Sequence, residues 1–197
     1  MLIQVAGCDP SLRNWGTSRG VYDTQTKKVT IQQLSVINPE LPTGKQVRQN
    51  SLDLESAKQL CEGTLEAVKG AQAIFVEVPV GSQSARAMAS YGICCGVLGA
   101  LRATQVPFFE VTPTEVKLAG FGKKTATKQE MIHWAMSQHP EANWPMYKQK
   151  GNTIVIEAKA EHMADATAAI YAGIASNAFQ QMLPMWQTKG IYFADSS

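Results

Sequence analysis

The hydrophobic and polar positions divide the first part of the chain into three strand-like segments. Residues 2 to 9 form an apolar run that closes on Asp9, which predicts a buried strand. Residues 16 to 22 and 29 to 37 predict two further strands. The polar turn residues between these two segments indicate that the three strands form an antiparallel meander.

The middle of the chain alternates helical and strand-like patterns. Residues 38 to 50 are polar and predict a loop, and residues 52 to 68 have the apolar spacing of a helix. Residues 71 to 78 are continuously apolar, which favours a strand buried on both faces. Residues 84 to 104 predict a helix whose three glycines indicate close packing, and residues 108 to 111 predict a strand.

The remaining segment predicts mainly helices. Thr112 to Glu115 and Thr127 to Glu130 are capping boxes, in which a threonine and a glutamate three residues later satisfy the first turn of a helix. Residues 139 to 153 predict a loop. Residues 158 to 181 predict one long helix, loosened near Gly173.

Three strands followed by strand–helix units predict an α/β fold with a mixed five-stranded sheet flanked by helices. The 197 residues suffice for one domain, with a core over about residues 1–177 and a tail over 178–197. No apolar run approaches the roughly 20 residues of a membrane helix. The missing signal peptide and the irregular spacing of the four cysteines favour a cytoplasmic protein with reduced thiols.

Acidic residues stand at the ends of two predicted strands and on the last long helix. Right-handed crossovers would bring Asp9 and Glu77 together at one end of the sheet. His162 and Asp165 lie three residues apart and therefore share a helix face. Taken singly, Asp9 also fits a turn and His162 an ordinary structural histidine. Together the four predict a site for Mg²⁺ or Mn²⁺. These cations prefer oxygen ligands, and enzymes that hydrolyse phosphodiesters often hold two of them in one active site.

Positive charge is concentrated in one segment, although the net charge of the chain is only +2. Residues 115 to 150 contain six lysines against three glutamates, a local excess of three. Such a cluster is typical of a surface that binds a phosphate backbone, but a solvated helix face has the same composition. The glycine-rich loop 120–125 carries Lys123 and Lys124, which we expect to contact DNA.

Four motifs follow one another in the chain. They are Gly7-Cys8-Asp9-Pro10-Ser11 with Gly16, the strand-end Glu77, the basic segment with Pro113 to Lys117, Gly120-Phe121-Gly122 and Ala126 to Lys128, and His162-Met163-Ala164-Asp165. In this order they resemble the RuvC-like Holliday junction resolvases of the ribonuclease H-like superfamily, over about residues 1–177. Ser11 replaces a common glycine of the family, and Val78 follows Glu77 where some members have an aromatic residue.

The resemblance implies a structure-selective DNA endonuclease that nicks four-way junctions. It implies a homodimer, two Mg²⁺ or Mn²⁺ ions per active site, and a bacterial cell or phage-infected host. The helix over 84–104 is our candidate for the dimer interface, because its glycines permit close approach, and packing on the chain's own sheet is an equally good explanation of them. The implied metal-binding and catalytic residues are Asp9, Glu77, His162 and Asp165, and the implied phosphate contacts are Lys117 and Lys128.

Other functions remain open at the level of the sequence. A ribonuclease H-like nuclease could act on flaps or RNA–DNA hybrids, and a DNA-binding module could keep the fold without cleavage. Grouped acids argue against the second alternative, because they repel phosphate unless a cation is bound. An actin-like ATPase also places an acid at a strand end, but it usually needs two such domains and a longer chain.

Overall fold

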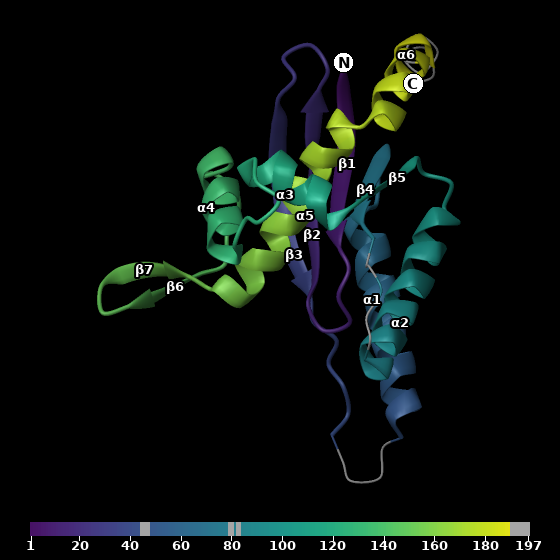
Figure 1. Cartoon of the computed structure of the whole chain (residues 1–197), viewed down its shortest axis with the longest axis vertical. Coiled ribbons are helices and arrows are strands. Elements are labelled where there is room, and N and C mark those ends of the chain that lie inside the picture. The colour runs from purple at the N-terminus through teal and green to yellow at the C-terminus, as the bar shows by residue number, and fades with distance from the viewer. Residues whose placement is uncertain (44–47, 79–80, 82–83, 190–197) are drawn as a thin grey trace.

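A mixed five-stranded sheet forms the centre of the structure, in the order β3-β2-β1-β4-β5 (Figure 1). The computed structural model describes residues 1–43, 48–78, 81 and 84–189, the last three of them by backbone alone. The strands are β1 Leu2–Asp9, β2 Trp15–Asp23, β3 Val29–Ile37, β4 Ala73–Glu77 and β5 Phe108–Val111. The first three are antiparallel neighbours, whereas β1, β4 and β5 run parallel. The predicted mixed sheet is confirmed.

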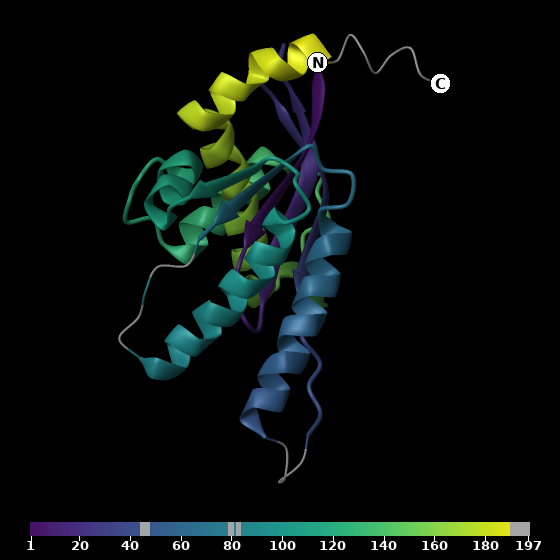
Figure 2. The ribbon, with the colours of Figure 1, turned by 90° about the vertical axis from the view of Figure 1, so that its right-hand side faces the viewer.

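Helices cover both faces of this sheet. They are α1 Gln49–Ala67, α2 Ala85–Arg102, α3 Pro113–Phe121, α4 Lys128–Gln138, α5 Glu157–Ala175 and α6 Asn177–Lys189. The pair α1 and α2 packs on one face, and α5 packs on the other with α3 and α4 against it (Figures 1 and 2). Within the described part of the chain, none of these helices has the length and apolarity needed to cross a membrane.

Strand β4 shows why the central segment is apolar throughout. Phe75 belongs to the core cluster on the α5 side, whereas Ile74 and Val76 belong to the cluster on the α1 and α2 side. All three are fully buried. Because successive side chains of a strand point to opposite faces, a strand covered on both sides must be apolar at every position. The prediction of burial on both faces is confirmed.

Two glycines allow α5 to lie directly on the sheet. A Cβ atom at Gly7 of β1 would overlap the carbonyl oxygen of Ala166, and one at Gly16 of β2 would overlap that of His162. Both obstacles belong to the helix backbone, which cannot move aside as a flexible side chain could. Glycine at these two positions therefore sets the distance between the strands and the helix that carries His162 and Asp165.

The prediction of a loop over residues 139–153 is wrong. The segment contains two strands, β6 Met146–Gln149 and β7 Asn152–Val155, which pair as a separate antiparallel hairpin. Gln149 pairs with Asn152, so only Lys150 and Gly151 form the turn. Both residues have positive φ angles, 49° and 83°, as a two-residue type I′ turn requires.

The single helix predicted over residues 158–181 is two helices. Ser176 has an extended backbone (φ −68°, ψ 144°) and separates α5 from α6. Helix α5 continues through Gly173 to Ala175, and the glycine there gives room to Phe75, whose ring a Cβ atom would overlap. Helix α6 adds the buried Phe179 and Leu183 to the core. The final residues of the expected tail, 190–197, lie outside the described residues.

The glycines of α2 also differ from expectation. A Cβ atom at Gly92, Gly96 or Gly99 would meet no atom within 4 Å. These positions lie four and three residues apart, so they follow one side of the helix. The close packing that the three glycines predicted is therefore not provided by the chain's own sheet.

Candidate active site

The four predicted acidic and imidazole residues lie at one end of the sheet. Asp9 ends β1 and Glu77 ends β4, and these strands are parallel neighbours with Cys8 opposite Val76. The register therefore places Asp9 and Glu77 at adjacent strand ends. His162 and Asp165 come from α5, whose backbone lies against β1 and β2 at Gly7 and Gly16.

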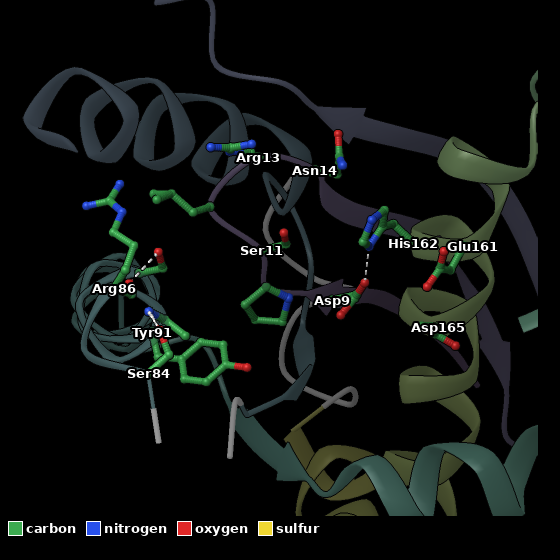
Figure 3. Close-up of a pocket in the computed structure, with 14 residues that line it drawn as sticks. Asp9, Ser11, Arg13, Asn14, Ser84, Arg86, Tyr91, Glu161, His162 and Asp165 are labelled. Atoms are coloured by element: carbon green, nitrogen blue, oxygen red, sulfur yellow. Dashed lines mark hydrogen bonds and ion pairs between the residues drawn. The ribbon is translucent and has the colours of Figure 1, made fainter. Parts of the chain in front are cut away.

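Asp9 and His162 are joined directly. The Nδ1 atom of His162 lies 2.6 Å from Oδ2 of Asp9, in a partly buried pair (Figure 3). A carboxylate can only accept, so Nδ1 carries the proton and Nε2 is left to accept a proton or bind a cation. Burial lowers the pKa of His162, but the hydrogen bond and charge of Asp9, with the charges of Glu161 and Asp165, raise it above its usual value.

The remaining carboxyl groups lack enough positive charge around them. Burial, followed by the charges of Asp9 and Asp165, raises the pKa of Glu77 to about 8, although Lys117 acts in the opposite direction. Burial, followed by the charges of Asp9 and Glu161, raises the pKa of Asp165 to about 7. Buried acids whose ionised forms are destabilised by one another are typical of sites that bind a cation or transfer a proton.

This charge distribution fits a divalent cation. Oxygen atoms of Asp9, Glu77 and Asp165, with an imidazole nitrogen of His162, match the ligand preference of Mg²⁺ and Mn²⁺. A cation would also stabilise the ionised forms that burial and mutual repulsion disfavour. In the arrangement seen, no group of three or more His, Cys, Asp or Glu side chains among the described residues could hold an ion together.

An open cavity of about 660 Å³ lies beside these residues. Asp9, His162 and Asp165 line one part of it, while Arg86 and Tyr91 of α2 stand across from them (Figure 3). Glu77 is not among the lining residues, although its charge interacts with those of Asp9 and Asp165. The cavity thus combines acids on one side with cationic and aromatic groups on the other.

The four candidate lysines occupy different positions. The charge of Lys117 lowers the pKa of both Glu77 and Asp165, so this lysine belongs to the surroundings of the acids. The ammonium of Lys128 lies 2.6 Å from Oε1 of Glu161, which lines the cavity. Lys123 and Lys124 are exposed and do not line the cavity. Lys117 and Lys128 therefore lie close to the acids, whereas Lys123 and Lys124 lie on the surface between α3 and α4.

Several cavity residues were not predicted. Glu161 is four residues before Asp165 and shares its helix face, so its spacing could have identified it. Arg86 makes two hydrogen bonds of 2.7 Å to the carboxylate of Asp53, which join α2 to α1. This contact and the position of Arg13 on the cavity wall depend on how separate elements pack, and no local pattern indicates them.

Comparison with known proteins places the fold. No protein-family model matches the chain, and no curated protein sequence matches it significantly. Among solved structures, RuvC of Thermus thermophilus with a Holliday junction substrate is 22% identical, with a TM-score of 0.61 over 91% of this chain and 96% of that one. A second T. thermophilus RuvC structure is also 22% identical, with a TM-score of 0.60 over 93% and 97%.

The yeast mitochondrial Holliday junction resolvase Ydc2 is more distant, at 15% identity and a TM-score of 0.50 over 91% of this chain and 86% of that one. Strand order, the antiparallel meander and the helices on both faces agree with this likeness. The chain therefore has the ribonuclease H-like fold of the RuvC structures.

Proposed function

We propose that this protein is a divalent-metal-dependent, structure-selective DNA endonuclease that nicks four-way junctions. The observation that carries the proposal is the meeting of Asp9, Glu77, His162 and Asp165 at one end of the sheet, with too little positive charge around the acids. The RuvC fold supports the same conclusion, because one of the similar structures is a RuvC bound to a Holliday junction substrate.

The chain's own residues would divide the work of hydrolysis. Asp9, Glu77 and Asp165 would hold two Mg²⁺ or Mn²⁺ ions, which supply an activated water and stabilise the leaving oxygen. Asp9 fixes the ring of His162 through Nδ1, so Nε2 is available to hold a cation or accept a proton. Lys117 is close enough to the acids for its charge to act on them, and it would meet the phosphate that enters there.

A homodimer would place two such sites on a junction with two-fold symmetry. We infer that α2 forms its interface. Gly92, Gly96 and Gly99 follow one exposed side of the helix, where their missing side chains allow a second helix to approach closely. Beside this side of α2 lies a shallow hollow lined in part by Leu98 and Phe108, which a second copy would cover.

The test is a cleavage assay on four-way junction, flap, linear duplex and RNA–DNA hybrid, with Mg²⁺, Mn²⁺ or EDTA. Junction-selective nicking that needs the metal is the expected result. The matched control is Asp9→Asn, which removes one ligand charge and keeps the shape of the side chain. Asp9→Asn should bind the junction and leave it uncut. If the protein cleaves flap or hybrid in preference to the junction, that DNA is its substrate instead. Cleavage of the junction by Asp9→Asn would overturn the assignment of Asp9 to the active site.

A further inference from the structure

The β6–β7 hairpin extends away from the rest of the molecule (Figure 1). All four residues of β6 and the two turn residues are exposed, including Tyr147 at 44%. Val155, near the end of β7, packs against the core, and the amide of Ile156 donates to the carbonyl of Pro145 across the base. The hairpin is therefore anchored at its base and projects its turn into solvent.

Such a ribbon gains little from folding alone. A two-stranded hairpin is marginally stable in water unless a third strand or a helix covers it. Here the type I′ turn at Lys150 and Gly151 sets the register, and of the two strands only Ile154 and Val155 are partly buried. Ordering this hairpin costs conformational entropy and adds little to the core. A binding role would explain why the protein has it.

The charge of the hairpin identifies the class of ligand. Between Glu141 and Glu157 the sequence has no acidic residue, and the cations in this interval are Lys148 and Lys150. Lys148 is paired across the ribbon with Thr153, and Lys150 is at the tip. A two-stranded ribbon also has dimensions that the major groove of B-DNA admits. A cationic ribbon of this width is complementary to a DNA duplex.

The place of the hairpin gives its reach. Its base adjoins Ile156, the N-cap of α5, and His162 lies six residues further along the helix, roughly 9 Å at 1.5 Å per residue. The four-residue strands extend roughly 13 Å in addition. A span of about 20 Å corresponds to about six base pairs at 3.4 Å each.

We propose that the β6–β7 hairpin binds the duplex arm of the DNA substrate, about six base pairs from the cleavage point, with Lys148 and Lys150 on its phosphates. The inference rests on the proposed function and deepens it. The hairpin would hold one arm of the junction beside the acids, outside the cavity, and thereby add affinity without taking part in the chemistry.

The test uses the double variant Lys148→Thr with Lys150→Asn. Threonine suits a strand, and asparagine tolerates the positive φ of the turn, so the hairpin should keep its shape. The control is Lys28→Ala with Lys69→Ala, which removes the same charge from exposed lysines at the opposite end of the sheet. Junction affinity is measured in EDTA over a range of salt concentrations, so the result does not depend on cleavage.

The hairpin variant should bind a junction with 15-base-pair arms at least about tenfold more weakly than wild type at 0.1 M salt, with a salt slope smaller by about 1.8. The control variant should retain wild-type binding. Shortening the arms to about four base pairs should remove the difference between wild type and the hairpin variant.

Equal binding by the hairpin variant and wild type, or equal loss in the control, would overturn the hairpin proposal even if the protein cleaves junctions. A persistent difference on short arms would show that the lysines act elsewhere. If the hairpin effect appears while the wild-type protein cuts no substrate, the endonuclease proposal fails and the hairpin proposal stands. If wild type binds no DNA, the hairpin proposal fails as well.

Discussion

His162 donates a hydrogen bond of 2.6 Å from Nδ1 to the carboxylate of Asp9, and so joins the last long helix to the end of the first strand. The contact ties two residues 153 positions apart. It also partly satisfies the charge of Asp9, whereas Glu77 and Asp165 remain in surroundings that disfavour ionisation.

Without metal, the protein should lose stability as the pH rises. The pKa of Glu77 is raised from 4.5 to about 8, so between these values the folded chain keeps a proton that the unfolded chain has lost. The stability is fully present below about pH 4.5 and is lost through about pH 8. Asp165 acts in the same direction between 3.8 and about 7. Each unit of difference corresponds to about 1.4 kcal/mol.

Thermal unfolding between pH 5 and 8, in EDTA and in Mg²⁺, measures this effect. The melting temperature should fall with pH in EDTA, and Mg²⁺ should restore most stability at the upper end, where the carboxylates are ionised. Glu77→Gln should flatten the EDTA curve and weaken the response to Mg²⁺. Identical pH curves with and without Mg²⁺ would contradict a cation site at these acids.

His162→Ala should slow cleavage by about a hundredfold or more, because loss of a residue that holds a metal or transfers a proton has effects of this size. His162→Asp should keep partial activity, since a carboxylate can replace imidazole as a ligand of a hard cation. Single-turnover rates in Mg²⁺ and binding in EDTA separate the two effects. An inactive His162→Asp protein that still binds Mg²⁺ would assign proton transfer to the imidazole.

Gly16→Ala should impair both folding and activity. The added Cβ would overlap the carbonyl of His162 and push α5 away from β2. Overpacking of this kind typically costs about 1–3 kcal/mol, and it would also displace His162 from Asp9. Urea unfolding and cleavage rates measure the two consequences. Gly70→Asn, at an exposed position before β4 where asparagine tolerates the positive φ of 76°, is the control and should preserve both. A stable and fully active Gly16→Ala protein would contradict the close packing of α5.

Gly96→Leu should disrupt the proposed dimer and leave the monomer folded. The position is open to solvent, and a Cβ atom there would meet no atom within 4 Å, but a leucine would separate two helices that approach along this side. Leucine also has a higher helix propensity than glycine. Sedimentation velocity should show dimers for the wild type and monomers for the variant, and thermal unfolding should show that the variant still unfolds cooperatively. The variant should lose paired nicking of both junction strands. A monomeric wild-type protein that makes paired nicks would refute the dimer requirement.

Different lysines of the basic segment should affect DNA affinity and turnover. Lys123→Ala with Lys124→Ala should weaken binding to all DNA sequences alike and reduce the salt slope by up to about 1.8, because phosphate contacts carry no base information. Lys128→Ala should reduce turnover more than affinity. The substitution removes the partner of Glu161 and leaves its charge uncompensated beside Asp165. Salt-dependent binding and single-turnover rates measure both. A triple variant with unchanged affinity and salt slope would show a merely solvated surface.

The sheet and the acids could be predicted because each depends on local patterns. The apolar runs that end at Asp9 and Glu77 identify strands, and the handedness of crossovers places their ends together. The β6–β7 hairpin could not be found in this way. Most of its residues are exposed on both faces, so it lacks the alternation of polar and apolar residues that marks a half-buried strand.

Other features depend on packing between distant segments. The glycines of α2 indicated close contacts, but a sequence does not tell whether the contact lies inside the chain or on its surface. The ion pair of Arg86 with Asp53 joins α2 to α1 through two residues that are 33 positions apart. No local sequence pattern indicates it. The break at Ser176 was missed because the apolar positions continue through it to Phe179.

The docking of α5 on Gly7 and Gly16 has a consequence for the cell that makes this protein. His162 and Asp165 meet Asp9 only when that helix lies on the sheet, and they are synthesised more than 150 residues after it. Translation releases a chain from its N-terminus onward. For the proposed nuclease, cleavage activity therefore arises only when the whole chain has folded. A polypeptide still on the ribosome, or a partly unfolded molecule, would not cut the genome.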